Sequence, residues 1–232
     1  APVHATLGQL VRGLDAEEAR AIRTAVGDSH RLATARELRQ AHLPGTAGIA
    51  GAGGYEPVVP LATNRYANRM AGRSQDEYAV LFQVRRPSPW LDRLAVSHLL
   101  LDGRDAATAR AFAAWPEVER FATERVLRQN PAPMPRFAVP SRVEVQPDLR
   151  TAVERLGTLA PDTVLLDRAL PHTPGATGTV AVVEERPERL VLRATLTQPA
   201  VVIVRDTLAP GWQANVDDRE VTAARADGLF RA

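Results

Sequence analysis

Short apolar runs separated by turn residues dominate the last third of the chain. Residues 180–183 form one such run, and residues 190–197 follow the period of two that is typical of a half-buried strand. Residues 201–204 supply a third run of β-formers, and Asp217-Asp218 has the composition of a hairpin turn. The pattern predicts consecutive antiparallel strands at this end of the chain.

Helical spacing appears nearer the N-terminus. Apolar residues within 14–26 recur at helical intervals, Asp15 suits the N-cap, and two glutamates follow at the favourable end of the helix dipole. The other expected elements are a strand at 31–35, a helix at 61–70, a buried strand at 95–101, a partly helical segment at 105–127 broken at Trp115-Pro116, a helix at 149–156 and a strand at 163–166.

A proline-rich stretch over residues 130–140 is the best candidate for a domain boundary. We therefore expect an α+β chain, with an N-terminal α/β domain over residues 1–130 and an antiparallel β-sandwich-like domain over residues 131–232. The chain opens on Ala1-Pro2 and stops inside an expected strand, so we expect a piece of a longer protein whose second domain is truncated at its C-terminal end.

The amino-acid composition argues against several classes of function. The 232 residues include 29 basic side chains, all of them arginine, against 27 acidic ones that are interspersed among them. There is thus no basic stripe that would favour a nucleic-acid partner. The absence of cysteine excludes disulfides, thiolate metal sites and cysteine nucleophiles. The most apolar stretch falls far short of the ~20 residues that a membrane span needs.

No motif in the chain carries a recognisable reaction. The glycine-rich residues 44–54 do not complete a dinucleotide fingerprint, and no serine-hydrolase elbow is present. The five histidines are scattered without metal-ligand spacing, and His98, within an apolar run, is expected to be a satisfied core residue. We accordingly expect no catalytic residue, no metal and no cofactor in this chain.

Two features allow more than one interpretation. Asp206, Asp217 and Asp218 could supply oxygen ligands to calcium, but without the spacing of a known loop they are more typical of turns. Trp212, directly after Pro210-Gly211, could stack on a sugar ring. A tryptophan in that position more commonly fills a core, and the core interpretation is favoured.

The ordered landmarks of the chain resemble those of the YfhO-type bacterial membrane proteins. Residues 204–218 contain an apolar strand, Arg-Asp, Pro-Gly-Trp and then Val-Asp, and residues 226–232 resemble the family's next strand. Residues 54–60, 91–100 and 135–140 resemble a Gly-Tyr-Asp-Pro turn, a strand and a Pro-Arg linker of the same family. In order, these matches extend over nearly the whole chain.

The chain also departs from that family pattern. Leu208-Ala209 replaces an aromatic pair, which weakens any carbohydrate-stacking role for that loop, and Asp218 replaces a turn glycine.

The resemblance implies an extracytoplasmic domain of a polytopic membrane protein similar to glycosyltransferases that use lipid-linked sugars. It implies a domain that is not catalytic alone, that lies on the outer face of the bacterial cell membrane against the protein's own transmembrane region, and that assists in binding a glycan or polyprenyl-linked sugar. Tyr55 and Glu56 are then candidates for a surface facing the membrane-embedded site, or for a purely structural turn. Trp212 is the third candidate binding residue.

Three alternatives belong to other function classes. A freestanding carbohydrate-binding β-sandwich predicts an exposed aromatic platform. A soluble enzyme predicts clustered titratable groups in a cleft. An uncharacterised structural or interaction domain predicts neither of these features.

Overall fold

The computed structural model describes residues 14–35, 48–52, 59–78, 84–186 and 188–232. Within them the chain has an α+β fold. The helices are α2 (Ala16–Val26), α4 (Leu61–Met70), α5 (Pro89–Arg93), α6 (Ala106–Ala111) and α7 (Leu149–Arg155). Tyr55, Glu56 and most of the glycine-rich segment lie outside the described residues, so their expected roles stay predictions. No helix in the described ranges is long and apolar enough to cross a membrane.

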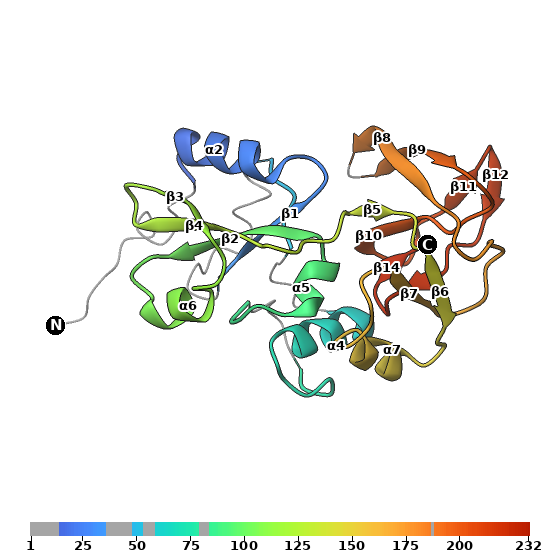
Figure 1. Cartoon of the computed structure of the whole chain (residues 1–232), viewed down its shortest axis with the longest axis horizontal. Helices are drawn as coiled ribbons and strands as arrows, with labels where there is room; N and C mark the ends of the chain where they lie inside the picture. The colour runs from blue at the N-terminus through green and yellow to red at the C-terminus, as the bar shows by residue number, and fades with distance from the viewer. Residues whose placement is uncertain (1–13, 36–47, 53–58, 79–83, 187) are drawn as a thin grey trace.

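The first sheet has the strand order β1-β2-β4-β3 (Figure 1). Its strands are β1 (Arg31–Thr34), β2 (Val96–Asp102), β3 (Glu117–Arg120) and β4 (Arg125–Gln129). β1 runs parallel to β2, and the other pairs are antiparallel. Helix α2 packs Ile22 and Val26 against Leu32, Leu100 and Leu127 on one face of this sheet.

Helix α2 begins where the sequence predicts. The Asp15 side chain accepts a hydrogen bond from the Glu18 backbone N–H at 2.8 Å. The Glu18 carboxylate in turn accepts a hydrogen bond from the Asp15 backbone N–H, which completes a capping box. Glu18 is buried and also pairs with Arg125 of β4 at 2.5 Å. Asp15 therefore fixes the start of the helix, and Glu18 fixes the position of the helix on the sheet.

The second sheet has six strands in the order β5-β10-β14-β13-β7-β6. They are β5 (Phe137–Ala138), β6 (Arg142–Val145), β7 (Thr163–Leu166), β10 (Ile203–Thr207), β13 (Arg225–Ala226) and β14 (Phe230–Arg231). Its pairings are antiparallel except for the parallel pair of β6 and β7, so this sheet is mixed.

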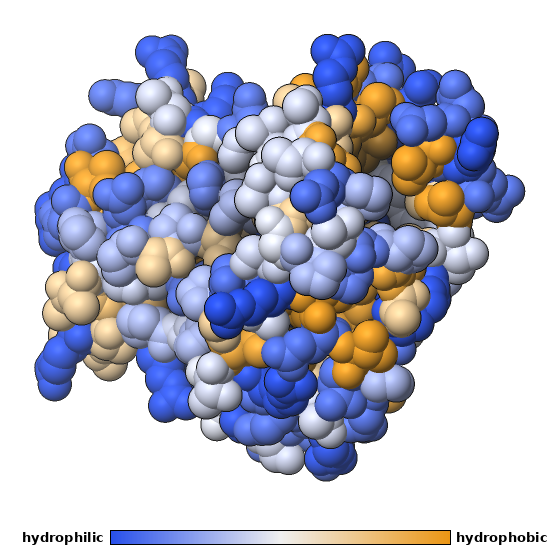
Figure 2. Space-filling view, turned by 45° about the vertical axis from the view of Figure 1, so that its right-hand side comes forward, coloured by the Kyte–Doolittle hydropathy of each residue, from blue (hydrophilic) through white to orange (hydrophobic). Residues whose placement is uncertain are grey.

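Two separate hairpins accompany the second sheet (Figure 1). They consist of β8 (Gly178–Arg186) with β9 (Arg189–Leu196), and of β11 (Ala214–Val216) with β12 (Arg219–Val221). The turn predicted at Asp217-Asp218 is confirmed, with φ angles of 49° and 62°. The predicted strand over residues 190–197 also forms, but only its first half is partly buried. Apolar side chains are accordingly exposed among charged ones on this side of the molecule (Figure 2).

The prediction for residues 105–127 is confirmed in part. The alanine-rich start is helical in α6, and the helix does not continue past Trp115-Pro116, after which the chain forms β3 and β4. These two strands were not predicted. Val126 and Leu127 are buried where β4 pairs with β2, and this tertiary pairing decides the conformation there. Elsewhere the predicted helices at 61–70 and 149–156 and the predicted strand at 163–166 are confirmed.

One hydrophobic core extends across the proline-rich segment between the two sheets. It contains Leu99 of the first sheet and Ile203 of the second, together with the rings of Tyr66 and Phe230, whose centroids are 5.5 Å apart. The Trp90 indole N–H donates to the Val153 carbonyl at 3.1 Å across the same junction. The strands of the first sheet end at Gln129 and those of the second begin at Phe137, while the two sheets share one apolar interior.

A fully buried ion cluster lies beside this core. Asp227 Oδ2 accepts hydrogen bonds from Arg93 at 2.9 Å and from Arg205 at 3.3 Å, and Asp227 Oδ1 accepts from the Leu165 backbone N–H at 3.0 Å. Arg93 also donates to three backbone carbonyls, so each charged group of the cluster has partners in the interior.

Replacing Asp227 by alanine would leave two buried guanidinium groups without their carboxylate. We expect Asp227→Ala to lower the free energy of unfolding by about 3–5 kcal/mol, measured by urea denaturation. As a control, Asp218→Gly in the exposed hairpin turn should leave stability unchanged or slightly raised, because glycine adopts positive φ without strain. Equal stability of Asp227→Ala and the natural chain would contradict a structural role for this cluster.

Candidate functional site

A cleft of about 300 Å³ lies between the β8–β9 hairpin and the second sheet. Trp212, one of the candidate binding residues, lines it and is partly exposed, and it is not among the residues of the two hydrophobic core clusters. The cleft combines charged, aromatic and aliphatic side chains from segments far apart in the chain. Its lining residues are Arg136, Glu185, Arg186, Leu190, Asp206, Trp212 and Arg231.

Strand pairing brings these residues together. β10 lies between β5 and β14, so Asp206 of β10 has Arg136, next to β5, on one side and Arg231 of β14 on the other. The end of β8 contributes Glu185 and Arg186 from the hairpin. The ribbon of this hairpin is seen close to β5 and β10 in Figure 1.

Asp206 organises the floor of the cleft. Its two carboxylate oxygens accept a fork of hydrogen bonds from Arg136, from Nε at 2.8 Å and from the second terminal nitrogen at 2.9 Å. Arg31 donates to the same carboxylate, and it also donates to the Leu94 and Arg205 carbonyls at 2.9 and 2.6 Å. The carboxylate therefore joins the first sheet, the linker and the second sheet.

These contacts shift the pKa of Asp206. Burial alone would raise it, but the hydrogen bonds from Arg136 and the positive charges of Arg31 and Arg136 outweigh burial, and the pKa of Asp206 lies below its ordinary value of 3.8. Asp206 is thus a fixed anion at neutral pH. The sequence suggested calcium or a turn for this residue; the structure places it within strand β10 and gives it arginine partners instead.

Arg231 and Trp212 form the second feature of the cleft. The guanidinium carbon of Arg231 lies 3.8 Å from the centre of the Trp212 ring, and Arg231 Nε donates to the Thr207 carbonyl at 3.1 Å. Burial lowers the pKa of Arg231, the charge of Asp206 opposes this shift and that of Arg136 adds to it, but an arginine stays cationic at neutral pH. The pair offers a ligand both an aromatic ring and a positive charge.

Glu185 completes the polar lining. It accepts one hydrogen bond from the first terminal nitrogen of Arg136 at 2.7 Å, and its side chain is 41% exposed, against 13% for Asp206. The cleft thus presents three guanidinium groups and two carboxylates, with the guanidinium of Arg31 behind them.

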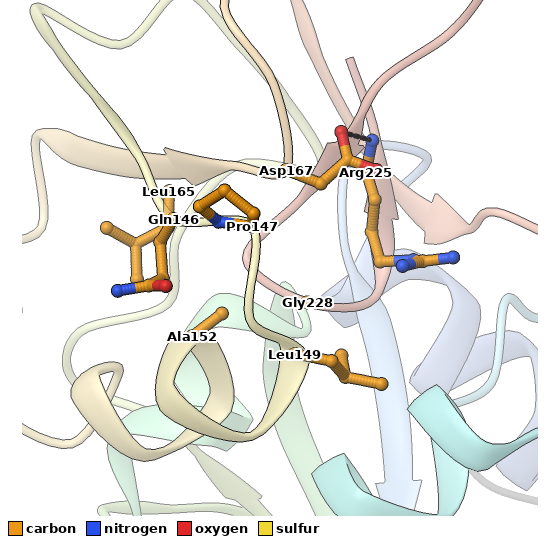
Figure 3. A pocket seen from close by; sticks show the side chains of 8 residues that line it. All are labelled: Gln146, Pro147, Leu149, Ala152, Leu165, Asp167, Arg225 and Gly228. Carbon is orange, nitrogen blue, oxygen red and sulfur yellow. Dashed lines mark hydrogen bonds between the residues drawn. The ribbon is translucent and has the colours of Figure 1, made fainter.

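A second hollow lies at the other end of the same sheet and holds no more than about one water molecule, at roughly 10 Å³. Figure 3 shows it between helix α7, whose Leu149 and Ala152 point towards it, and the Asp167–Arg225 pair, in which the Arg225 backbone N–H donates to Asp167 at 3.0 Å. Gly228 closes one side at φ 72°, and a side chain there would meet Val153 at 2.8 Å. The hollow is too small to bind an organic ligand.

Outside the cleft and the buried Asp227 cluster, the described residues place titratable groups singly or in small groups with a structural role, as His98 illustrates. His98 is buried in β2, its Nδ1 lies 2.9 Å from the Ser97 hydroxyl, and burial lowers its pKa, which confirms it as a satisfied core histidine. In the described part of the chain, no group of three or more histidine, aspartate or glutamate side chains is arranged to hold a metal ion.

Sequence reasoning identified Trp212 but missed the arginines around it. The available signal was a charged side chain within or beside an otherwise apolar strand, as at Arg205-Asp206 and at Arg231 after Phe230. Such residues need buried partners, although the pattern does not say which ones.

Comparison of the chain with protein-family models, with curated proteins and with solved structures gave no match.

Replacing Asp206 by asparagine tests the organising role of its charge. We expect Asp206→Asn to lower the free energy of unfolding by about 2–3 kcal/mol at pH 7, because Arg136 and Arg31 lose their anion. A carboxylate with a depressed pKa contributes stability above its unfolded-state pKa of 3.8 and loses it as the pH falls through the lower folded value. The difference between the two proteins should therefore shrink below pH 3.8.

Urea denaturation at neutral pH and at about pH 2.5 measures this difference directly. Asp162→Asn is a suitable control, since Asp162 is exposed and its pKa is also lowered, chiefly by the hydrogen bond from Ser141. That variant should change stability much less. A constant difference between Asp206→Asn and the natural chain at both pH values would contradict the assignment of Asp206 as the anion.

Proposed function

We propose that this chain is a non-catalytic, extracytoplasmic domain of a polytopic membrane protein related to lipid-linked-sugar glycosyltransferases, and that its cleft helps to bind a glycan or glycolipid acceptor. The observation that supports this most is the cleft of about 300 Å³ lined by Trp212, three arginines and two carboxylates. The ordered resemblance over residues 54–60, 91–100, 135–140 and 204–232 supplies the membrane-protein context.

The size and lining of the cleft suit a small polar ligand. Its volume is at the lower end of the ~300–1,000 Å³ that small-molecule sites span. Guanidinium and carboxylate groups can donate to and accept from sugar hydroxyls, while Trp212 and Leu190 provide an apolar surface for ring carbons. A partly exposed tryptophan with polar groups nearby is the arrangement that carbohydrate binding needs, even though Leu208-Ala209 lacks the aromatic pair of the family pattern.

The state of the carboxylates supports binding over catalysis. Asp206 is held ionised by Arg136 and Arg31, with a lowered pKa, so it is poorly suited to donate a proton at neutral pH. Glu185 also pairs with Arg136. Groups engaged in this way can orient a ligand without reacting with it.

A freestanding carbohydrate-binding module is the second candidate, because the partly exposed Trp212 would serve it equally well. The two proposals differ in the sequence of the gene on either side of the segment that encodes this chain. Several flanking spans of ~20 apolar residues each would support the membrane-protein proposal. Flanks without such spans would contradict it and favour the freestanding module.

Removing the Trp212 ring tests glycan binding. Trp90 and Trp115 are buried, so a change in intrinsic fluorescence on titration with bacterial envelope oligosaccharides should come mainly from Trp212. We expect Trp212→Ala to weaken binding about tenfold and Trp212→Phe to weaken it less, because phenylalanine keeps an aromatic face. Calorimetric titration measures the affinity of each variant for the oligosaccharides.

Val216→Ala provides the matched control, since Val216 is exposed on strand β11 of the neighbouring hairpin and does not line the cleft. It should bind as the natural chain does. Oligosaccharide affinity that is unchanged in Trp212→Ala would exclude this cleft as the glycan site.

A further inference from the structure

The positive charges of the cleft are unequally neutralised. Asp206 is shared between Arg136 and Arg31, and Arg186 pairs with Glu184 at 2.8 Å. Arg231, in contrast, donates to the Thr207 carbonyl and stacks on the Trp212 ring; the charge of Asp206 acts on it from nearby, but among the described residues it forms no ion pair with a carboxylate. Its two terminal nitrogens are therefore suited to receive an anion from solution.

The two carboxylates on Arg136 are also unequal. Asp206 holds Nε and one terminal nitrogen through a fork of two hydrogen bonds and is largely buried. Glu185 holds the other terminal nitrogen through one hydrogen bond, and 41% of its side chain is exposed. Displacing an exposed carboxylate that makes one hydrogen bond costs little free energy, whereas displacing the buried, doubly bonded carboxylate of Asp206 costs more. Glu185 is thus the exchangeable anion of the cleft.

Arg136 and Arg231 lie close enough to act on one ligand. Both line the same cleft, and the charge of Arg136 contributes to lowering the pKa of Arg231. A phosphate or carboxylate between them would accept hydrogen bonds from two guanidinium groups, which is a strong form of anion recognition in proteins. The sugar ring of such a ligand would then be next to Trp212.

We propose that the cleft selects an anionic glycan, whose phosphate or carboxylate group binds Arg231 and takes the place of Glu185 on Arg136. The anion site follows from the arginine geometry alone, while the sugar part of the ligand rests on the function proposed above. Glu185 then acts as an internal competitor that occupies the site when no ligand is bound and that weakens the binding of adventitious anions.

Inorganic phosphate, glucose 1-phosphate, glucuronate and glucose are the probes, titrated by calorimetry at low ionic strength. Phosphate tests the anion site without a sugar. Glucose 1-phosphate and glucuronate distinguish a phosphorylated glycan from a uronate-bearing one, and glucose tests the sugar without a charge. We expect both anionic sugars to bind more tightly than glucose, and added salt to weaken them.

Two substitutions separate the roles of the side chains. Glu185→Gln should raise the affinity for inorganic phosphate about tenfold, because the internal competitor is lost. Arg231→Gln should lower that affinity about tenfold or more, because a charge-assisted contact is removed. Each has a matched control on β6, at the opposite edge of the sheet. Glu144→Gln removes a carboxylate of similar exposure, paired with Arg155, and Arg142→Gln removes an exposed arginine; neither should alter binding.

The possible outcomes distinguish a failure of the anion site from a failure of the glycan function. Phosphate binding that depends on Arg231 and Glu185, with no binding of glucose and with glucose 1-phosphate bound no more tightly than phosphate, would support the anion site and overturn the glycan function. Equal binding of glucose and the anionic sugars, unaffected by Arg231→Gln, would support the glycan function and overturn this inference. Glu185→Gln and Glu144→Gln with equal phosphate affinities would overturn the competition by Glu185. Failure of all four probes to bind would overturn both proposals.

Discussion

The fold depends on a buried carboxylate that two arginines hold from different directions. Asp227 is completely buried, Arg93 approaches it from helix α5, and Arg205 approaches it from strand β10. An isolated charge in this position would be too costly to bury, so each member of the cluster requires the others. The five donors of arginine allow Arg93 to bond a carboxylate and three carbonyls at once, which is more than the three donors of a lysine could satisfy. A chain whose basic residues are all arginine is suited to such clusters.

The cleft is a direct consequence of the same strand. Neighbouring residues of a strand point to opposite faces, so Arg205 and Asp206 serve different sites. Arg205 points into the interior towards Asp227, and Asp206 organises the cleft through Arg136 and Arg31. Arg31 also donates to the Arg205 carbonyl. One dipeptide thus connects the interior, the first sheet and the candidate binding site.

Local features of the fold could be predicted from the sequence because local interactions decide them. The capping box at Asp15 fixed the start of α2, and the paired aspartates at 217–218 fixed a hairpin turn. The partly helical character of residues 105–127 and the break at Trp115-Pro116 could be predicted, but strands β3 and β4 could not, because they depend on the pairing of β4 with β2. The cleft could not be predicted, because Arg136 and Asp206 are 70 positions apart in the sequence. The sequence around an arginine does not indicate which distant carboxylate it bonds.

The β8–β9 hairpin is more exposed to solvent than the strands of the central sheets. A two-stranded ribbon with solvent on much of both faces is only marginally stable in isolation, and most of its side chains are exposed. Segments of this kind open locally at a small free-energy cost while the core stays folded. Since the hairpin carries Glu185 and Leu190, one wall of the cleft can be rearranged without unfolding the sheet that carries Asp206 and Arg231. Under the proposed function, the cleft would combine a floor fixed by the sheet with a wall that adjusts to the length of the ligand.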